Sequence, residues 1–165
     1  MVEELLALEG SESVLDVGCG PGLYAKPLKR RGHEVWAIDF AAEMVAMVTG
    51  HVDHASVADI ETFDLGRTFD RILCLGVLEF VAQPEAVFDR LRDHLAPMGR
   101  LVVLVPRQGF GGWIYKREKR KHGLTVRLCS ESMLRRWGDG AGLSYVGRRI
   151  PFIHNLVVVF QKGQQ

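Results

Sequence analysis

The run of residues 14–22, which reads VLDVGCGPG, constrains the fold of this chain more than any other part of its sequence. An apolar stretch typical of a buried strand leads directly into glycines at alternate positions, Gly18, Gly20 and Gly22. Only residues without a bulky side chain allow so tight a turn, and a helix that starts after it directs backbone N–H groups at a ligand. The run therefore predicts a strand, a turn and a helix that form a nucleotide-sized binding site.

The rest of the chain alternates short apolar runs with helix-like patterns, which is typical of a mostly parallel sheet covered by helices. Seven strands are expected, the last two too close together for a crossover helix and therefore antiparallel. We expect strands at residues 13–17, 34–38, 55–58, 69–75, 100–105, 143–148 and 155–161. We expect helices at residues 2–8, from the glycine turn to about 31, at 41–49, from Pro84 to a stop near Pro97 and Gly99, and from Ser130 to Gly140. These elements predict a Rossmann-like α/β fold, a seven-stranded, mostly parallel sheet with a C-terminal antiparallel hairpin and helices on both faces.

Length and composition restrict the possible classes. A chain of 165 residues suits one domain, and its formal net charge of +1 predicts neither nucleic acid nor membrane as a partner. The first eight residues contain two glutamates and no basic residue, so no signal peptide is expected. The three cysteines fit neither a disulfide framework nor a zinc pattern, which favours the cytoplasm. His51 and His54 are not accompanied by a third and fourth candidate ligand at the spacing of a metal site, so no metal site is expected.

The spacing of the glycines distinguishes two kinds of ligand. A dinucleotide fingerprint has glycine at the first, third and sixth positions, and the sixth position counted from Gly18 is Leu23. Glycine at the fifth position, Gly22, fits the alternative spacing. Asp16 lies two residues before the first glycine, where its carboxylate would repel a pyrophosphate and attract a cationic amine. The residues thus favour a ligand with a positive amine and a sulfonium over a dinucleotide.

The run VLDVGCGPG resembles the first motif of the class I S-adenosylmethionine-dependent methyltransferases, and the similarity extends through nearly the whole chain, with the small-molecule branch as the nearest subgroup. The resemblance implies S-adenosyl-L-methionine as the cofactor. It places Asp39 where the family binds both ribose hydroxyls, and it places Asp59 near the adenine amino group. Residues 69–81 of the chain resemble the family's motif that lies at the methionine end of the cofactor. The cofactor-binding residues expected are Asp16, Gly18, Cys19, Gly20, Gly22, Asp39, Phe40, Met44, Asp59, Ile60, Leu75 and Gly76.

The resemblance identifies no catalytic residue. Members of the small-molecule branch often read L-E-H after the fourth strand, and this chain reads Leu78-Glu79-Phe80, which removes the obvious base for O-methylation. Glu79 is a candidate substitute, although a structural role at a helix start fits it better.

The acceptor side is expected in residues 107–142, an insertion within a single domain of residues 1–165 that includes the basic run 116–121. That run could bind an anionic partner, but we favour a solvated lid helix as its role. Arg107 and Arg127 are the better candidates for contact with an anionic acceptor. The favoured function is methyl transfer to a small molecule. A non-catalytic cofactor-binding subunit is the alternative, and an NAD-dependent oxidoreductase is the weakest reading because no hydride-transfer residue pair is evident.

Overall fold

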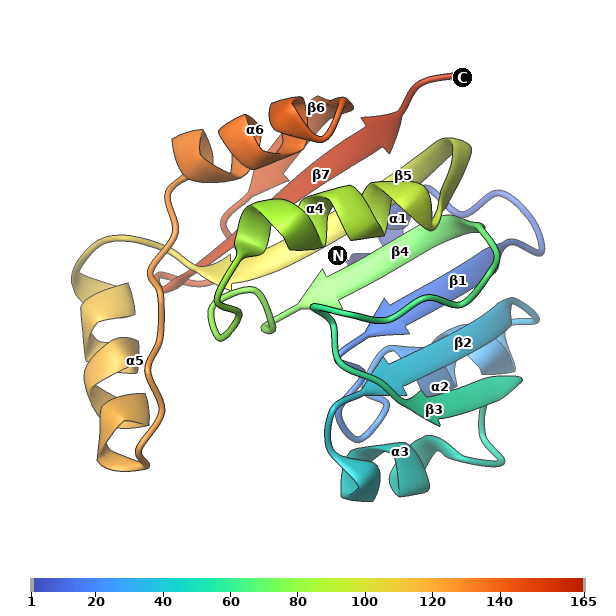
Figure 1. Ribbon diagram of the computed structural model, residues 1–165, viewed down its shortest axis with the longest axis horizontal. Helices are drawn as coiled ribbons and strands as arrows, with labels where there is room; N and C mark the ends of the chain where they lie inside the picture. The colour runs from blue at the N-terminus through green and yellow to red at the C-terminus, as the bar shows by residue number, and fades with distance from the viewer. Residues whose placement is uncertain (1, 165) are drawn as a thin grey trace.

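The computed structural model describes residues 2–164 and contains one seven-stranded sheet, ordered β3-β2-β1-β4-β5-β7-β6 (Figure 1). The first five strands are parallel, and β7 pairs antiparallel with both β5 and β6. The predicted fold class is confirmed. The strands are β1 (Ser13–Val17), β2 (Glu34–Asp39), β3 (His54–Val57), β4 (Phe69–Leu75), β5 (Leu95–Pro106), β6 (Leu143–Arg149) and β7 (Asn155–Lys162). The helices are α1 (Val2–Leu6), α2 (Ala25–Arg30), α3 (Ala42–Val48), α4 (Pro84–Asp93), α5 (Phe110–Lys121) and α6 (Glu131–Gly140).

Apolar side chains bury both faces of the sheet, because the central parallel strands carry almost continuous apolar runs. On one face α4 and α6 contribute Phe88 and Trp137 to the larger cluster. On the other face α1 and α2 contribute Leu6 and Leu28 to a second cluster. Figure 1 shows α4 and α6 in front of the sheet and α1 and α2 behind it. The rigid centre that results fixes the ends of β1, β2 and β4, from which the loops of the site begin.

Two predicted boundaries around the fifth strand were wrong. The helix α4 ends at Asp93, and β5 begins at Leu95, so Pro97 and Gly99 lie inside a strand and do not end a helix. Leu95 pairs with Phe69, and a register shift follows before Arg71 pairs with Arg100. Such a bulge accommodates a proline and a glycine within a strand, because the ladder is interrupted there.

Smaller differences affect the elements around the site. Helix α2 starts at Ala25, so two residues, Leu23 and Tyr24, separate Gly22 from the first helical turn. Strand β2 extends one residue further than predicted, because Asp39 pairs with Val57 of β3. The third strand runs His54–Val57, one residue earlier than predicted, and α1 ends at Leu6, before Ala7 with a φ of 47°. Ser130 caps α6 as predicted, since its hydroxyl accepts a hydrogen bond of 3.2 Å from the Met133 N–H.

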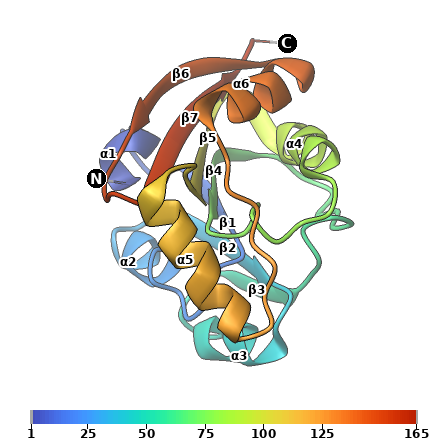
Figure 2. The same cartoon turned by 90° about the vertical axis from the view of Figure 1, so that its left-hand side faces the viewer.

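Helix α5 stands apart from the sheet at one end of the molecule (Figure 1), the end that faces the viewer in Figure 2. Gly112 is its only buried residue, and a β-carbon there would lie 1.9 Å from the Arg107 carbonyl oxygen. Across residues 2–164, every helix is too short or too polar to traverse a lipid bilayer.

Candidate functional site

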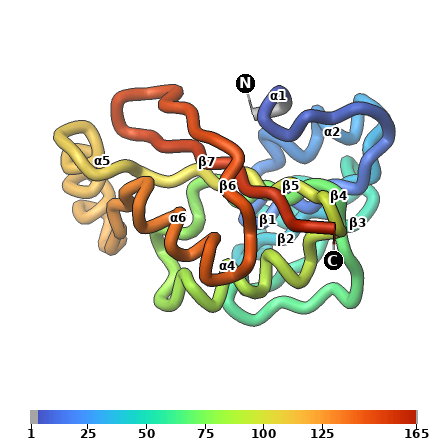
Figure 3. The backbone as a smooth tube through the Cα atoms, turned by 90° about the horizontal axis from the view of Figure 1, so that it is seen from above, coloured from blue at the N-terminus to red at the C-terminus, as the bar shows by residue number. Residues whose placement is uncertain are grey.

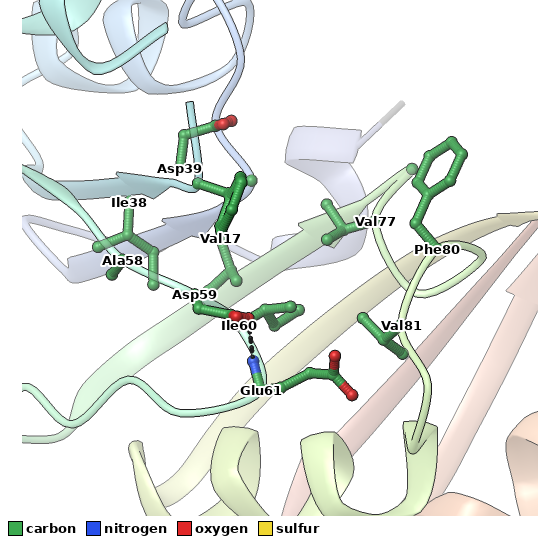
Figure 4. A pocket seen from close by; sticks show the side chains of 13 residues that line it. Val17, Ile38, Asp39, Ala58, Asp59, Ile60, Glu61, Val77, Phe80 and Val81 are labelled. Atoms are coloured by element: carbon green, nitrogen blue, oxygen red, sulfur yellow. Dashed lines mark hydrogen bonds between the residues drawn. The ribbon is translucent and has the colours of Figure 1, made fainter. Parts of the chain in front are cut away.

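A pocket of about 410 Å³ opens at the carboxyl ends of the parallel strands (Figure 4). It lies where the strand order reverses between β1 and β4, so that the loops after these two strands diverge and leave a crevice. Its volume is in the usual range for small-molecule sites. The lining residues are Val17, Gly18, Ile38, Asp39, Phe40, Ala58, Asp59, Ile60, Glu61, Gly76, Val77, Phe80 and Val81.

The glycine turn forms one wall of this pocket. The backbone N–H groups of Gly18 and Cys19 donate to the Ile38 carbonyl oxygen at 2.8 and 3.0 Å, which ties the turn to β2. Gly18 has a φ of 70°, and a β-carbon there would lie 2.1 Å from Val77 Cγ2. Glycine is therefore required at this position both by backbone conformation and by the close approach of the loop after β4.

Asp39 lies at the end of β2, beside the glycine turn. Its Oδ2 accepts a hydrogen bond of 2.9 Å from the Gly20 N–H, and its Oδ1 accepts one of 2.9 Å from the Ala41 N–H. These two contacts orient the carboxylate at the pocket. Phe40 follows it with 76% of its surface exposed, so an aromatic face is available beside an oriented negative charge.

The segment after β3 forms the opposite wall. Asp59 Oδ1 accepts a hydrogen bond of 2.8 Å from the Glu61 N–H, and the Ile60 side chain is buried (Figure 4). Glu61 Oε1 in turn accepts from the N–H groups of Ala82 and Gln83, each at 3.1 Å. This bridge joins the loop after β3 to the start of α4 and holds the two sides of the pocket together.

Asp16 lies in the interior of the protein and does not line the pocket. Its side chain is 2% exposed, and its Oδ2 has no hydrogen-bond partner among the residues that the structure describes. Burial raises the pKa of this carboxyl to about 7, and the charge of Asp39 adds to the rise, while a hydrogen bond from the Ala25 backbone opposes it. Strand β1 thus carries a buried carboxyl with one unpartnered oxygen, two residues before Gly18.

The structure brings only part of the predicted set to the pocket wall. Gly18, Asp39, Phe40, Asp59, Ile60 and Gly76 line it. Asp16, Cys19, Gly20, Gly22, Met44 and Leu75 do not. Cys19 is buried in the turn, and burial raises the pKa of its thiol to about 12. A β-carbon at Gly22 would lie 2.6 Å from Val48 Cγ1, so this glycine faces α3. Leu75 packs against the apolar cluster on the face that α1 and α2 cover.

Sequence reasoning missed seven of the lining residues, which are Val17, Ile38, Ala58, Glu61, Val77, Phe80 and Val81. Glu61 lies two residues after Asp59, and this short spacing was the available signal. Val77 and Val81 carry no functional pattern of their own, because Val77 packs against Gly18 and Val81 belongs to the larger apolar cluster. Phe80 occupies the place of the family's histidine, with 44% of its surface exposed.

A second space of about 450 Å³ adjoins the first one, with Phe80 and Val81 lining both. It lies toward α5, and its other lining residues are Glu79, Ala82, Lys116, Thr125, Val126 and Arg127. Glu79 is 3% exposed, and its Oε2 has no hydrogen-bond partner among the described residues. Burial raises the pKa of Glu79 to about 7, while a hydrogen bond from its own backbone and the charge of Lys119 lower it.

Arg127 holds the loop between the two spaces in place. Its Nη1 donates to the Val81 carbonyl oxygen at 3.1 Å, and its Nη2 donates to the Ala82 carbonyl oxygen at 3.2 Å. Its backbone N–H donates to the Glu79 carbonyl oxygen at 2.9 Å. The guanidinium thus has structural partners, and the return segment after α5 is fastened to the wall of the pocket.

His51 and His54 form no metal centre. His54 packs against Trp36, with ring centroids 3.9 Å apart. Among the described residues, no group of three or more His, Cys, Asp or Glu side chains could hold a metal ion.

Comparisons with known proteins agree on the type of domain. A family model described as a methyltransferase domain matches residues 1–147. The ubiquinone biosynthesis O-methyltransferase of Xylella fastidiosa (strain 9a5c) is 36% identical over 111 residues, which are 62% of this chain and 44% of that protein. The match thus covers less than half the length of this curated relative.

Solved structures share the fold. The S-adenosylmethionine-dependent methyltransferase from Mesorhizobium loti has a TM-score of 0.81 at 15% identity, covering 98% of this chain and 95% of its own. The N-methyltransferase NodS from Bradyrhizobium japonicum WM9, in complex with S-adenosyl-L-homocysteine, has a TM-score of 0.74 at 20% identity, covering 98% and 83%. At these identities the likeness concerns the fold alone.

Proposed function

This chain belongs to the class I S-adenosylmethionine-dependent methyltransferase family, and we propose that it transfers a methyl group from S-adenosyl-L-methionine to a small-molecule acceptor. The observation that carries this proposal is the convergence of four strand ends on one pocket. Gly18 after β1, Asp39 at the end of β2, Asp59 after β3 and Gly76 after β4 all line it. The curated relatives are named as O-methyltransferases, which supports a hydroxyl group as the acceptor.

The residues present fit the proposed cofactor. Asp39 offers an oriented carboxylate for ribose hydroxyls, since a carboxylate has lone pairs left after two hydrogen bonds. Phe40 and Ile60 offer apolar surface for the adenine ring, with Asp59 beside them. Asp16 does not line the pocket, but its buried Oδ2 lacks a donor, and we propose that a cationic amine of the ligand pairs with it.

When bound, S-adenosyl-L-methionine supplies an activated sulfonium methyl group that a nucleophile displaces in line. The protein's own contribution is to hold the acceptor against that methyl group and to exclude water. We assign the second space, beside Phe80 and Val81, to the acceptor, with residues 107–142 forming the acceptor side of a single domain. Its volume suits a small molecule.

We propose that Glu79 accepts the proton that the methyl acceptor loses. A hydroxyl acceptor must lose a proton as it is methylated, and Phe80 leaves no histidine in the usual place. Glu79 is among the residues that line the proposed acceptor space, and its buried Oε2 lacks a hydrogen-bond donor. In its ionised form this carboxylate accepts the proton, and its burial makes the protonated product stable.

Product release tests the proposal. The protein is incubated with S-adenosyl-L-methionine and a panel of phenols, catechols, amines and carboxylic acids, and S-adenosyl-L-homocysteine is quantified. In parallel, calorimetry measures the binding of S-adenosyl-L-methionine, S-adenosyl-L-homocysteine and NAD. We expect binding of the first two in the micromolar range, corresponding to about −8 kcal/mol, and none of NAD. Binding without turnover on any acceptor would favour a non-catalytic subunit, and tight NAD binding would overturn the cofactor assignment.

A further inference from the structure

Helix α5 and the β6–β7 connection lie together at one end of the molecule (Figure 3). Both segments carry exposed apolar side chains there. A β-carbon on Gly111 would lie 3.1 Å from the Ile153 carbonyl oxygen, and the Tyr115 ring stacks on His154 with centroids 5.9 Å apart, so the two segments touch. Phe110 is 76% exposed and Ile153 is 75% exposed. We call the exposed group the apolar tip, which consists of Phe110, Trp113, Ile114, Phe152 and Ile153.

Helix α5 changes character along its length. At 3.6 residues per turn, Phe110, Ile114, Arg117 and Lys121 share one face, which is exposed along its whole length. Gly112 is buried, and the half-buried Tyr115 and Lys119 lie on the opposite face. The outward face is therefore apolar in its first turns and cationic in its last.

Charge is segregated onto this end of the molecule. Residues 107–127 contain seven basic residues and one acidic residue, which leaves 14 basic and 19 acidic residues in the rest of the chain. The segment thus carries a formal charge of +6 and the remainder −5, a separation that the net charge of +1 conceals. None of the ion pairs among the described residues involves the run 116–121.

We propose that α5 and the β6–β7 connection dock on an anionic phospholipid surface, with the apolar tip among the headgroups and the run 116–121 on the lipid phosphates. A helix with separate apolar and basic parts, and exposed aromatic side chains beside cations, suits such an interface. Nucleic acid fits less well, because it uses aromatic faces and cations but offers no apolar medium for Ile114 and Ile153. This inference does not depend on the proposed methyl transfer.

Vesicle binding tests the docking surface. The full chain is sedimented with vesicles of phosphatidylcholine alone or mixed with phosphatidylglycerol. We expect binding to the anionic vesicles only, and weaker binding as salt is raised. The double variant R120E/K121E should lose at least about tenfold in affinity. The matched control R30E/R136E makes the same charge change on exposed residues of α2 and α6, and it should stay within about twofold of the wild type.

Tryptophan emission tests the apolar tip separately. Trp113 is 52% exposed, whereas Trp137 is buried, so anionic vesicles should shift the emission to the blue in the wild type and not in W113F. The variant F110S/I153S should bind at least about fivefold more weakly although its charge is unchanged. Equal losses in R120E/K121E and R30E/R136E would overturn the proposal. So would binding to an oligonucleotide at the same salt that is tighter than to anionic vesicles and leaves Trp113 emission unshifted.

Discussion

The carboxylate of Asp39 accepts a hydrogen bond of 2.9 Å from the backbone N–H of Gly20. This bond joins the end of β2 to the turn after β1, two loops that start on neighbouring parallel strands. A second bond from the Ala41 N–H leaves the carboxylate with one orientation, at the wall of the pocket. A ligand hydroxyl thus meets a charged acceptor that is already positioned, so little ordering entropy is lost on binding.

Replacing Asp39 with Ala should weaken S-adenosyl-L-methionine about ten- to a hundredfold, because a hydrogen bond to a charged group contributes about 1.5–3 kcal/mol. Calorimetry measures the affinity directly. Asp139→Ala, an exposed carboxylate on α6 that does not line the pocket, is the control and should leave affinity unchanged. An unaltered affinity in the Asp39 variant would place the ribose site elsewhere.

Replacing Gly18 with Ala should destabilise the protein by about 2–4 kcal/mol, through a left-handed backbone and an overpacked contact with Val77. Gly20 has a φ of 52°, but a β-carbon there would meet no atom within 4 Å. Replacing Gly20 with Ala should therefore destabilise the protein only through its left-handed backbone, by about 1–2 kcal/mol. Denaturant unfolding gives both values. Adding Val77→Ala should recover part of the loss in the Gly18 variant, and the absence of any recovery would show that the clash is relieved in another way.

Replacing Asp16 with Asn should stabilise the protein at neutral pH. The pKa rises from 3.8 to about 7 on folding, so the unfolded chain binds fewer protons in this window and stability falls as pH rises through it. The gain should therefore be small near pH 4 and complete above about pH 7, where it raises Tm by a few degrees, at roughly 2–4 °C per kcal/mol. Thermal unfolding across this pH range, with Asp139→Asn as the control, measures it. A gain that is independent of pH would mean that the Asp16 carboxyl does not titrate there.

The same Asp16 variant should bind S-adenosyl-L-methionine more weakly by about tenfold or more, since an amide cannot neutralise a cationic amine. Stability and affinity then change in opposite directions, which separates a binding role from a structural one. Calorimetry at pH 8 is the measurement, and equal affinity in the variant would remove Asp16 from the site.

Replacing Glu79 with Gln should lower kcat about a hundredfold on a hydroxyl acceptor and leave cofactor affinity unchanged. In the wild type, activity should rise with pH through about 7, because the ionised carboxylate is the proton acceptor. The variant should lose this dependence. Phe80→His in the Glu79→Gln background should restore part of the rate, since an imidazole then returns to the wall of the acceptor space. A variant with full activity and an unchanged pH profile would exclude Glu79 as the base.

Local patterns were sufficient for the order of the elements. Alternating apolar runs predicted all seven strands, and the bounds of β1 and β4 agree with the prediction. The position of Asp39 at the end of the second strand also follows from the sequence, because the strand's apolar run stops there. Strand ends in a parallel sheet share one edge, so the place of the site could be inferred without coordinates.

Packing decided what local patterns could not. Pro97 and Gly99 read as a helix stop, yet they lie in β5 because Leu95 pairs with Phe69 across a bulge. The burial of Asp16, the Val77 contact at Gly18 and the Glu61 bridge to α4 all join residues far apart in the chain.

The sequence by itself determined the fold class, the edge of the sheet that binds the cofactor and the family, since these depend on short-range periodicity and on one glycine turn. Only the tertiary structure decided which of the predicted residues reach the pocket and that Glu79 borders a second space. It also showed that the basic run stands on α5, a helix apart from the sheet (Figure 1) that also carries the exposed aromatic side chains of Phe110 and Trp113. The reason is physical: a side chain's exposure and partners depend on contacts between distant segments, which no local pattern encodes.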